Sequence, residues 1–226
     1  MNSMPDPLNR RHLLLRAGPG AWIGLSAISA CSVLRPAAIV GPRYYALDDG
    51  LGDAGPAPAA AEDGTLRPTL VVDAPQAAPG CDSAAIVYRR TPHQREVFAH
   101  SEWIAPPARM LAPLIVAALA RGGGLRAVVG APSAARADLR LQTLLLRLEQ
   151  DFGDTPSQVR LTLAATLVDD PGRTLLARRE FDLRIACASE DAYGGVVAAN
   201  LAVRALMTAL AAFCRDAARG WRPPAR

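Results

Sequence analysis

The sequence predicts an α+β fold in which two main helices pack on one face of a mixed, mostly antiparallel sheet. Two segments, one in the middle of the chain and one near its C-terminal end, carry apolar residues at helical spacing. About six to eight shorter runs alternate as strands do, and short turns join most of them. No βαβαβ alternation occurs. With 226 residues, 50% of them hydrophobic, the chain has room for one domain of ordinary size.

Residues 1–30 have the features of a bacterial export signal. A basic start that contains Arg10 and Arg11 precedes an apolar stretch without Lys or Glu. The stretch ends in ISAC at 28–31, which resembles the lipobox of bacterial lipoproteins, where the cysteine thiol accepts the lipid. We therefore expect a lipoprotein signal peptide and lipid attachment at Cys31. The alternative is an ordinary helix.

The same segment bears on the export route and the destination. The pair Arg10-Arg11 is typical of twin-arginine signals but also occurs in general secretory signals, so both routes stay open. The apolar run is too short to cross a hydrocarbon core of ~30 Å, and we expect no transmembrane helix. Acyl chains on Cys31 would then be the membrane attachment. Ser32 stands where an Asp would resemble an inner-membrane retention signal, which favours the periplasmic face of the outer membrane.

The mature chain is expected to consist of a tether, one domain and a tail. We place the tether at 31–42, the domain at 43–217 and the C-terminal tail at 218–226. The domain opens with an aromatic-rich strand at 44–47. A loop rich in Gly and Pro follows at 49–68, and we expect it to be flexible.

Three strands and a helix are expected after this loop. The strands are predicted at 69–73, 84–90 and 96–104, with turn residues between them. The helix is predicted to begin at the Pro pair 106–107 and to end before a run of three Gly residues. Pro113 falls within about two turns of the start, so it should kink or delay the helix without forbidding it.

The second half of the chain predicts a strand-rich region and a long helix. Strands are expected at 126–129 and 138–152, and the apolar positions of the longer strand change face, which predicts a bulge near 142–143. The alternation that follows predicts a hairpin with its turn at 169–172. The last element, about 190–217, is expected to be a long amphipathic helix.

The sequence offers little for catalysis or for a cofactor. No Lys occurs, which excludes a Walker A phosphate loop and Schiff-base chemistry. After signal cleavage His93 and His100 would be the remaining imidazoles, and no hydrolase or zinc-site motif surrounds them. The 25 basic residues are spread beside acids and form no patch, which argues against nucleic acid. We therefore expect no enzyme activity, cofactor, metal ion or nucleic-acid partner.

Three cysteines follow Cys31, and no His accompanies them at metal-binding spacing. In an oxidising periplasm one pair could form a disulfide. Cys81 with Cys187 is the preferred pair, because Cys214 falls on the apolar stripe of the last helix. Whether this bridge forms is left open.

Tyr44, Tyr45 and Trp103 are the notable aromatic residues of the domain. Packing in the sheet core or between helix and sheet explains such residues most often. Contact with a partner protein is the other role, because exposed aromatic side chains are enriched at interfaces. We keep the three as candidate partner-binding residues.

Several segments, taken together in order and spacing, resemble one known family. In the first half these are Tyr44-Tyr45-Ala46-Leu47, Ala85-Ile86-Val87-Tyr88-Arg89, and Glu102-Trp103 before the Pro-opened helix. In the second half these are Leu148 to Phe152, Val159 to Asp169, Leu176 to Phe181, and Gly194 to Ala205 with Asn200. From about 43 to 214 the chain resembles the ABC-type transport auxiliary lipoprotein family, which includes the lipoprotein of the paraquat-inducible intermembrane transport system.

The resemblance implies a non-enzymatic, lipid-anchored periplasmic protein. Such a protein would work with an MCE-domain (mammalian cell entry) protein and an inner-membrane permease or ABC transporter to move lipid between the two membranes. The family offers no catalytic residues to carry over. The chain departs from it in the loop 49–68 and at His93-Gln94-Arg95, which puts partner specificity in doubt more than fold.

Three roles remain open within this resemblance. The domain could dock the transporter at the outer membrane, with a homo-oligomeric ring as one arrangement. It could instead be a lipid-binding shuttle, which needs a cavity between helices and sheet. The many small residues of the predicted helices favour a filled core over such a cavity. A structural outer-membrane lipoprotein of another envelope complex is the third alternative.

Overall fold

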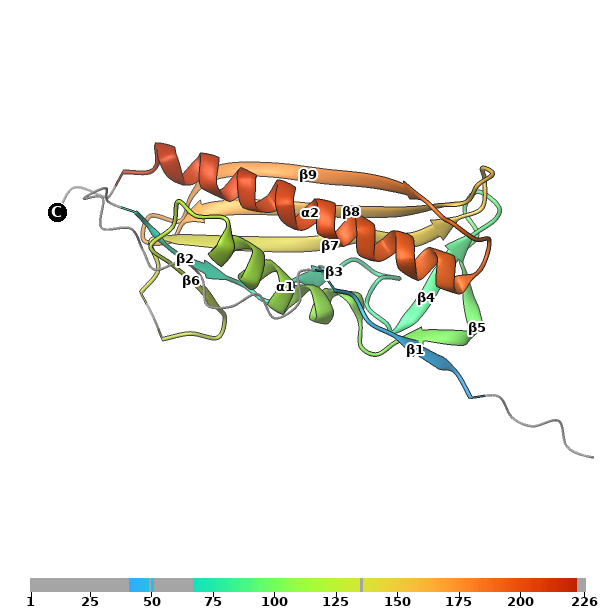
Figure 1. The fold of residues 1–226 in the computed structure, drawn as a ribbon. Coiled ribbons are helices and arrows are strands. Elements are labelled where there is room, and N and C mark those ends of the chain that lie inside the picture. Colours follow the sequence, from blue (N-terminus) through green and yellow to red (C-terminus); the bar gives the residue numbers. More distant parts are fainter. Residues whose placement is uncertain (1–40, 49, 51–66, 135, 223–226) are drawn as a thin grey trace, which may run out of the picture. The chain divides into compact units, whose positions relative to one another are not determined.

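The computed structural model describes residues 41–48, 50, 67–134 and 136–222. In chain order the elements are β1 (Arg43–Tyr45), β2 (Thr69–Val72), β3 (Gln76–Ala77), β4 (Ala85–Arg89), β5 (Glu96–Trp103), α1 (Pro107–Arg121), β6 (Ala127–Gly130), β7 (Leu139–Asp151), β8 (Gln158–Asp169), β9 (Thr174–Ala186) and α2 (Ala192–Gly220) (Figure 1). The predicted signal peptide, Cys31 and nearly all of the tether and of the loop 49–68 lie outside the described residues.

The strands form one mixed sheet that is organised around β7. On one side, β7 pairs with β8 and β8 with β9, both antiparallel and over almost their full lengths. The other edge of β7 is shared in turn by β2, β3 and β4, each parallel to it. β5 adds to β4 antiparallel, while β1 and β6 add to β5 and β2 in parallel. The long antiparallel strands thus dominate a mixed sheet, as the sequence predicted.

Both helices pack on the same face of this sheet, as predicted. α2 lies along β8 and β9, and α1 contacts α2, β6 and β7 (Figure 1). Leu161 and Leu163 of β8 are fully buried, as are Leu206 and Leu210 of α2. Phe181 of β9 is also buried, and its ring meets a phenyl ring of α2 edge to face, with the centroids 6.0 Å apart. The alternation of the strands and the helical stripe of α2 therefore supply one continuous core.

α1 has the ends that the sequence predicted. Pro106 is its N-cap, and the next Pro occupies the first helical position, where a missing N–H costs nothing. Pro113 lies inside the helix and does not end it. The N–H of Gly122 closes the last turn on the carbonyl of Ala118, and the two glycines that follow have positive φ.

The bulge in β7 lies further along the strand than predicted. Thr143 and Leu145 are both buried, so the alternation continues past the predicted position. The pairing with β8 shifts between Leu145 and Arg147, so that Leu146 is the extra residue. The expectation of a bulge near 142–143 was therefore wrong, because a small Thr, not a Leu, occupies the core position there.

α2 is the long amphipathic helix that the sequence predicted, and it ends three residues later than expected. Its N-cap Asp191 accepts a hydrogen bond from the N–H of Gly194 at 2.8 Å, and the helix runs to Gly220. Trp221 then packs into the core and donates its indole N–H to Asp169 at 3.1 Å, so the first residues of the expected tail are folded. Among the described helices, α2 has the length and composition of a membrane span. In this fold it is the core helix, with its apolar stripe buried on the sheet.

The cysteines within the described part of the chain are free. Cys81, Cys187 and Cys214 are all buried and unpaired. The thiol of Cys81 lies 3.6 Å from the carbonyl oxygen of Leu146 on β7. Cys187 follows β9, two strands away, and its N–H bonds to the carbonyl of Ser157. The hypothesis of a Cys81–Cys187 disulfide is therefore wrong for this fold, because β8 separates the two residues.

Candidate partner-binding site

The three candidate aromatic residues lie on neighbouring strands but have different environments. Tyr45 of β1 is in register with Trp103 of β5. Trp103 is only 3% exposed and belongs to the core, whereas Tyr44 is 63% exposed. Tyr45 is half-buried, with its ring centroid 6.3 Å from that of Tyr193 on α2. Of the three, Tyr44 and part of Tyr45 are open to a partner, and Trp103 is not.

Polar bonds hold the segment after Tyr45 against α2. The N–H of Ile104 donates to the carbonyl of Tyr45 at 2.7 Å. Asn200 of α2 donates from its amide nitrogen to the carbonyl of Ala46 and accepts from the N–H of Asp48 at 2.7 Å. Its side-chain amide therefore replaces a missing strand partner for this stretch of backbone. This gives a physical role to the Asn200 that contributed to the family resemblance.

Exposed apolar side chains surround this anchored segment. Besides Tyr44, the set comprises Ile104 at 61% exposure and Tyr193, Val197 and Leu201 of α2. The three α2 residues are four positions apart, so they form a second stripe beside the buried one. We call these five residues the apolar surface. Sequence analysis missed four of them, although the four-residue spacing outside the core stripe was a usable signal.

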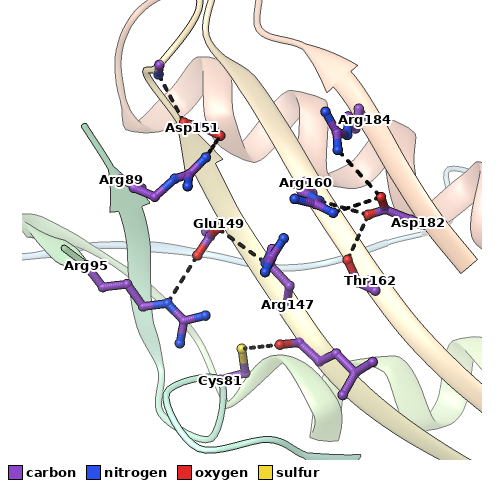
Figure 2. Close-up of polar contacts among 12 residues, drawn as sticks. Cys81, Arg89, Arg95, Arg147, Glu149, Asp151, Arg160, Thr162, Asp182 and Arg184 are labelled. Atoms are coloured by element: carbon purple, nitrogen blue, oxygen red, sulfur yellow. Dashed lines mark hydrogen bonds and ion pairs between the residues drawn. The ribbon is translucent and has the colours of Figure 1, made fainter. Parts of the chain in front are cut away.

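The opposite face of the sheet is charged. Arg160 of β8 donates two hydrogen bonds to Asp182 of β9, at 2.9 and 3.0 Å, and Thr162 adds a third at 2.9 Å (Figure 2). Arg184 approaches the same carboxylate at 3.8 Å. The hydrogen bonds from Arg160, and then that from Thr162, hold the pKa of Asp182 below its usual value.

A second group of charges joins β7 to the β4–β5 hairpin. Arg89 of β4 pairs with Asp151 of β7, and Glu149 lies between Arg95 and Arg147 at 3.3 and 3.4 Å (Figure 2). Burial would raise the pKa of Asp151, but the bonds from Arg89 and the N–H of Gly153 outweigh it and the pKa is lowered. Glu149 is 6% exposed, and the two guanidinium groups are the charge partners that a buried carboxylate requires.

Hollows of ligand size lie on this charged side. Two of about 410 and 390 Å³ open there, lined respectively around Gln142 and around Glu149. By contrast, the space between α2 and the sheet beside Trp103 is about 10 Å³, far below the few hundred Å³ typical of a ligand pocket. The part of the helix–sheet interface near Trp103 is therefore filled.

The two histidines considered for catalysis lie on the β4–β5 hairpin, and His93 is part of the lining of the hollow around Glu149. His93 is exposed in the turn between β4 and β5, and His100 is exposed on β5. In the residues that the structure describes, no three His, Cys, Asp or Glu side chains gather as metal ligands would.

The family resemblance is confirmed by comparison with known sequences. The family model described as ABC-type transport auxiliary lipoprotein component matches residues 50–216, which is most of the folded domain. No curated protein matches the chain.

Two solved structures are similar in fold. Protein XCC0632 from Xanthomonas campestris is 24% identical with a TM-score of 0.63, and the match covers 80% of this chain and 95% of that one. An uncharacterized protein is 15% identical with a TM-score of 0.59, and the match covers 77% of this chain and 99% of that one. At 24% and 15% identity, the likeness shows a shared fold and no more.

Proposed function

Because this chain belongs to the ABC-type transport auxiliary lipoprotein family, we propose that it docks an MCE-type lipid transport system at the outer membrane. In this role it is a non-enzymatic, lipid-anchored component that contacts an MCE-domain protein, which is served in turn by an inner-membrane permease or ABC transporter. A homo-oligomeric ring is one form of the docked state.

The observation that carries the docking role is the apolar surface. Large apolar side chains that are exposed near one another commonly mark protein interfaces. Here Tyr44, Ile104 and Tyr193 are each about three-fifths exposed, and they lie around the strand that follows the tether. Residues 31–42 could span at most about 40 Å. A lipid on Cys31 would therefore keep the apolar surface near the membrane.

The shuttle role receives less support from the structure. A shuttle must enclose at least one acyl chain, and the space beside Trp103 has room for about one water molecule. Small side chains of α2, including Ala199 and Ala202, are buried against the sheet and close the gap. The hollow around Glu149 is lined by charged and polar side chains, which suit a polar group better than an acyl chain.

A co-purification experiment tests the docking role. The full-length lipoprotein is isolated from its own membranes in mild detergent, and the proteins and lipids bound to it are identified by mass spectrometry. We expect an MCE-domain protein without stoichiometric lipid, and loss of that protein in the variant Tyr44→Ser/Tyr193→Ser. Leu175→Ser is the matched control, because Leu175 is 58% exposed but lies at the start of β9.

Other outcomes would contradict the docking role. Bound phospholipid without a protein partner would favour the shuttle. Recovery of a different envelope complex would favour a structural role in that complex. Equal loss of the partner in Tyr44→Ser/Tyr193→Ser and in Leu175→Ser would show that the apolar surface is not the contact.

A further inference from the structure

The hollow of about 390 Å³ on the charged face has a basic lining. It lies between the β4–β5 hairpin and β7 and is lined by Arg89, His93, Gln94, Arg95, Arg147 and Glu149. At neutral pH the lining holds three guanidinium groups and the carboxylate of Glu149, and Arg89 is paired with the carboxylate of Asp151 beside the hollow, so one net positive charge remains. Such a lining favours an anion.

The carboxylate of Glu149 lies beside two of the arginines but does not occupy all of their N–H donors. Arg95 and Arg147 approach Glu149 most closely through Nε, at 3.3 and 3.4 Å. Nε of Arg147 and Nε of Arg89 are both buried, and neither has a hydrogen-bond partner among the described residues. A guanidinium carries five N–H donors. The lining therefore has donors that the described part of the chain leaves unused.

The backbone opposite the hollow makes room for Arg95. Gly80 has a positive φ of 85°, and a Cβ at this position would stand 2.8 Å from Nη1 of Arg95. A larger residue would displace the guanidinium. The guanidinium of Arg95 therefore lies beside Glu149, in the space that Gly80 leaves free.

We propose that this hollow binds a phosphate-type anion, either the phosphate of a lipid headgroup or a free phosphate ester. Guanidinium groups bind phosphate through paired, charge-assisted hydrogen bonds. A phosphate monoester presents three terminal acceptor oxygens and the phosphodiester of a lipid headgroup presents two, so either can accept hydrogen bonds from more than one guanidinium group. The site is independent of the docking function, since it lies on the other side of the sheet from α2.

Arginine side-chain NMR of the full-length lipoprotein in a non-ionic detergent tests this site. Inorganic phosphate, glycerol 3-phosphate and dihexanoyl phosphatidylglycerol are each titrated. We expect the Nε–H signals of Arg89, Arg95 and Arg147 to shift along one saturable curve. The signal of Arg184, which lies on the same face but outside the hollow, should stay in place.

Two variants provide the matched comparison. Arg95→Gln removes one lining charge but leaves Arg147 beside Glu149, and we expect the dissociation constant for phosphate to rise about tenfold or more. Arg184→Gln removes an arginine that is also paired with a carboxylate, and should bind as tightly as wild type. If Arg95→Gln does not fold, the wild-type titration alone tests the site, because only the arginines that line the hollow should shift.

The three probes also separate the sources of the phosphate. Tighter binding of the phosphatidylglycerol than of inorganic phosphate would identify a headgroup site, and binding of the two soluble phosphates alone would identify a site for free esters. No saturable shift with any probe would overturn the proposal. So would equal weakening in Arg95→Gln and Arg184→Gln, because that pattern is nonspecific charge attraction.

Discussion

Asp182 shows how a single charge on the exposed sheet face depends on its strand neighbours. Its pKa is held below the usual value by Arg160 and then by Thr162, so the folded protein binds protons less readily there than the unfolded chain. This contribution to stability is present above pH ~4 and is lost as the pH falls through the lowered pKa. We expect Asp182→Asn to lower the free energy of unfolding at pH 7 by up to about 1 kcal/mol, as for exposed pairs.

Urea unfolding at several pH values checks this expectation. The difference between wild type and Asp182→Asn should shrink toward zero as the pH falls below the lowered pKa of Asp182. Glu180→Gln is the control, because Glu180 lies on the same strand and has no ion pair within the described residues. A difference for Asp182→Asn that is independent of pH would mean that packing, not charge, is lost.

The thiols form a second residue-scale test, because each described cysteine is buried and free. Burial raises the pKa of Cys214 to about 12 and also raises the pKa of Cys81 and Cys187. We expect the native protein to react slowly with a thiol reagent. The unreduced protein should show three thiols when denatured, if a lipid occupies Cys31. One thiol would indicate a disulfide, and a fourth would indicate an unmodified Cys31.

At the scale of elements, the first turn of α2 passes unusually close to the chain that leads into it. A Cβ at Gly194 would clash with the carbonyl oxygen of Ser189, and one at Gly195 would clash with the side chain of Gln150. Glycine inside a helix usually costs stability relative to Ala. At Gly194 the cost of the clash outweighs the helix propensity that Ala would gain, because the Ser189 carbonyl belongs to the backbone and cannot rotate away.

We therefore expect Gly194→Ala to destabilise the domain by about 1 to 2 kcal/mol, the range of an overpacked site. Chemical denaturation of the two proteins measures the difference. Gly220→Ala is the matched control in the same helix, since nothing lies within 4 Å of a Cβ there. A Gly194→Ala protein as stable as wild type would show that the connection at Ser189 moves freely.

The elements themselves were largely predictable, and the misses have physical reasons. Both helices followed from their apolar spacing and their Pro, Gly and Asp signals, because these act within a few residues of the helix end. The bulge at Leu146 was misplaced because Thr143 is polar by type yet buried by position. The parallel pairing of the short strands with β7 was beyond local signals, because it joins residues far apart in sequence.

The candidate site was predictable to a smaller extent. Tyr44 and Tyr45 could be proposed because aromatic residues stand out in a short strand, whereas Trp103 is buried in the core. The sequence cannot tell an exposed aromatic residue from a buried one on paired strands of similar composition. The ion pairs on the charged face of the sheet were also not predicted. Their residues come from four strands, and only the folded sheet brings them together (Figure 2).

For the whole molecule, we propose that Cys31 carries a lipid and that the residue after it decides which of the two membranes holds the protein. Ser32 follows Cys31, and resemblance to proteobacterial lipoproteins makes an Asp there a retention signal. We expect Ser32→Asp to move the protein from the outer-membrane to the inner-membrane fraction, with the domain unchanged because residue 32 precedes it. Separation of the two membranes on a density gradient measures the shift. Ser32→Asn is the control, and unchanged sorting of Ser32→Asp would refute the signal.

The central place of β7 also sets an order of assembly. β7, β8 and β9 are consecutive and join through short connections, so they can pair as soon as they are synthesised. β2, β3 and β4 come earlier in the chain but wait for β7, and such long-range pairing is slow because the loop must close first. In pulsed hydrogen exchange we expect β8 amides to be protected before those of β2. The short strands of the N-terminal half of the domain are then the last to be secured, and their pairing edges stay open until β7 is in place.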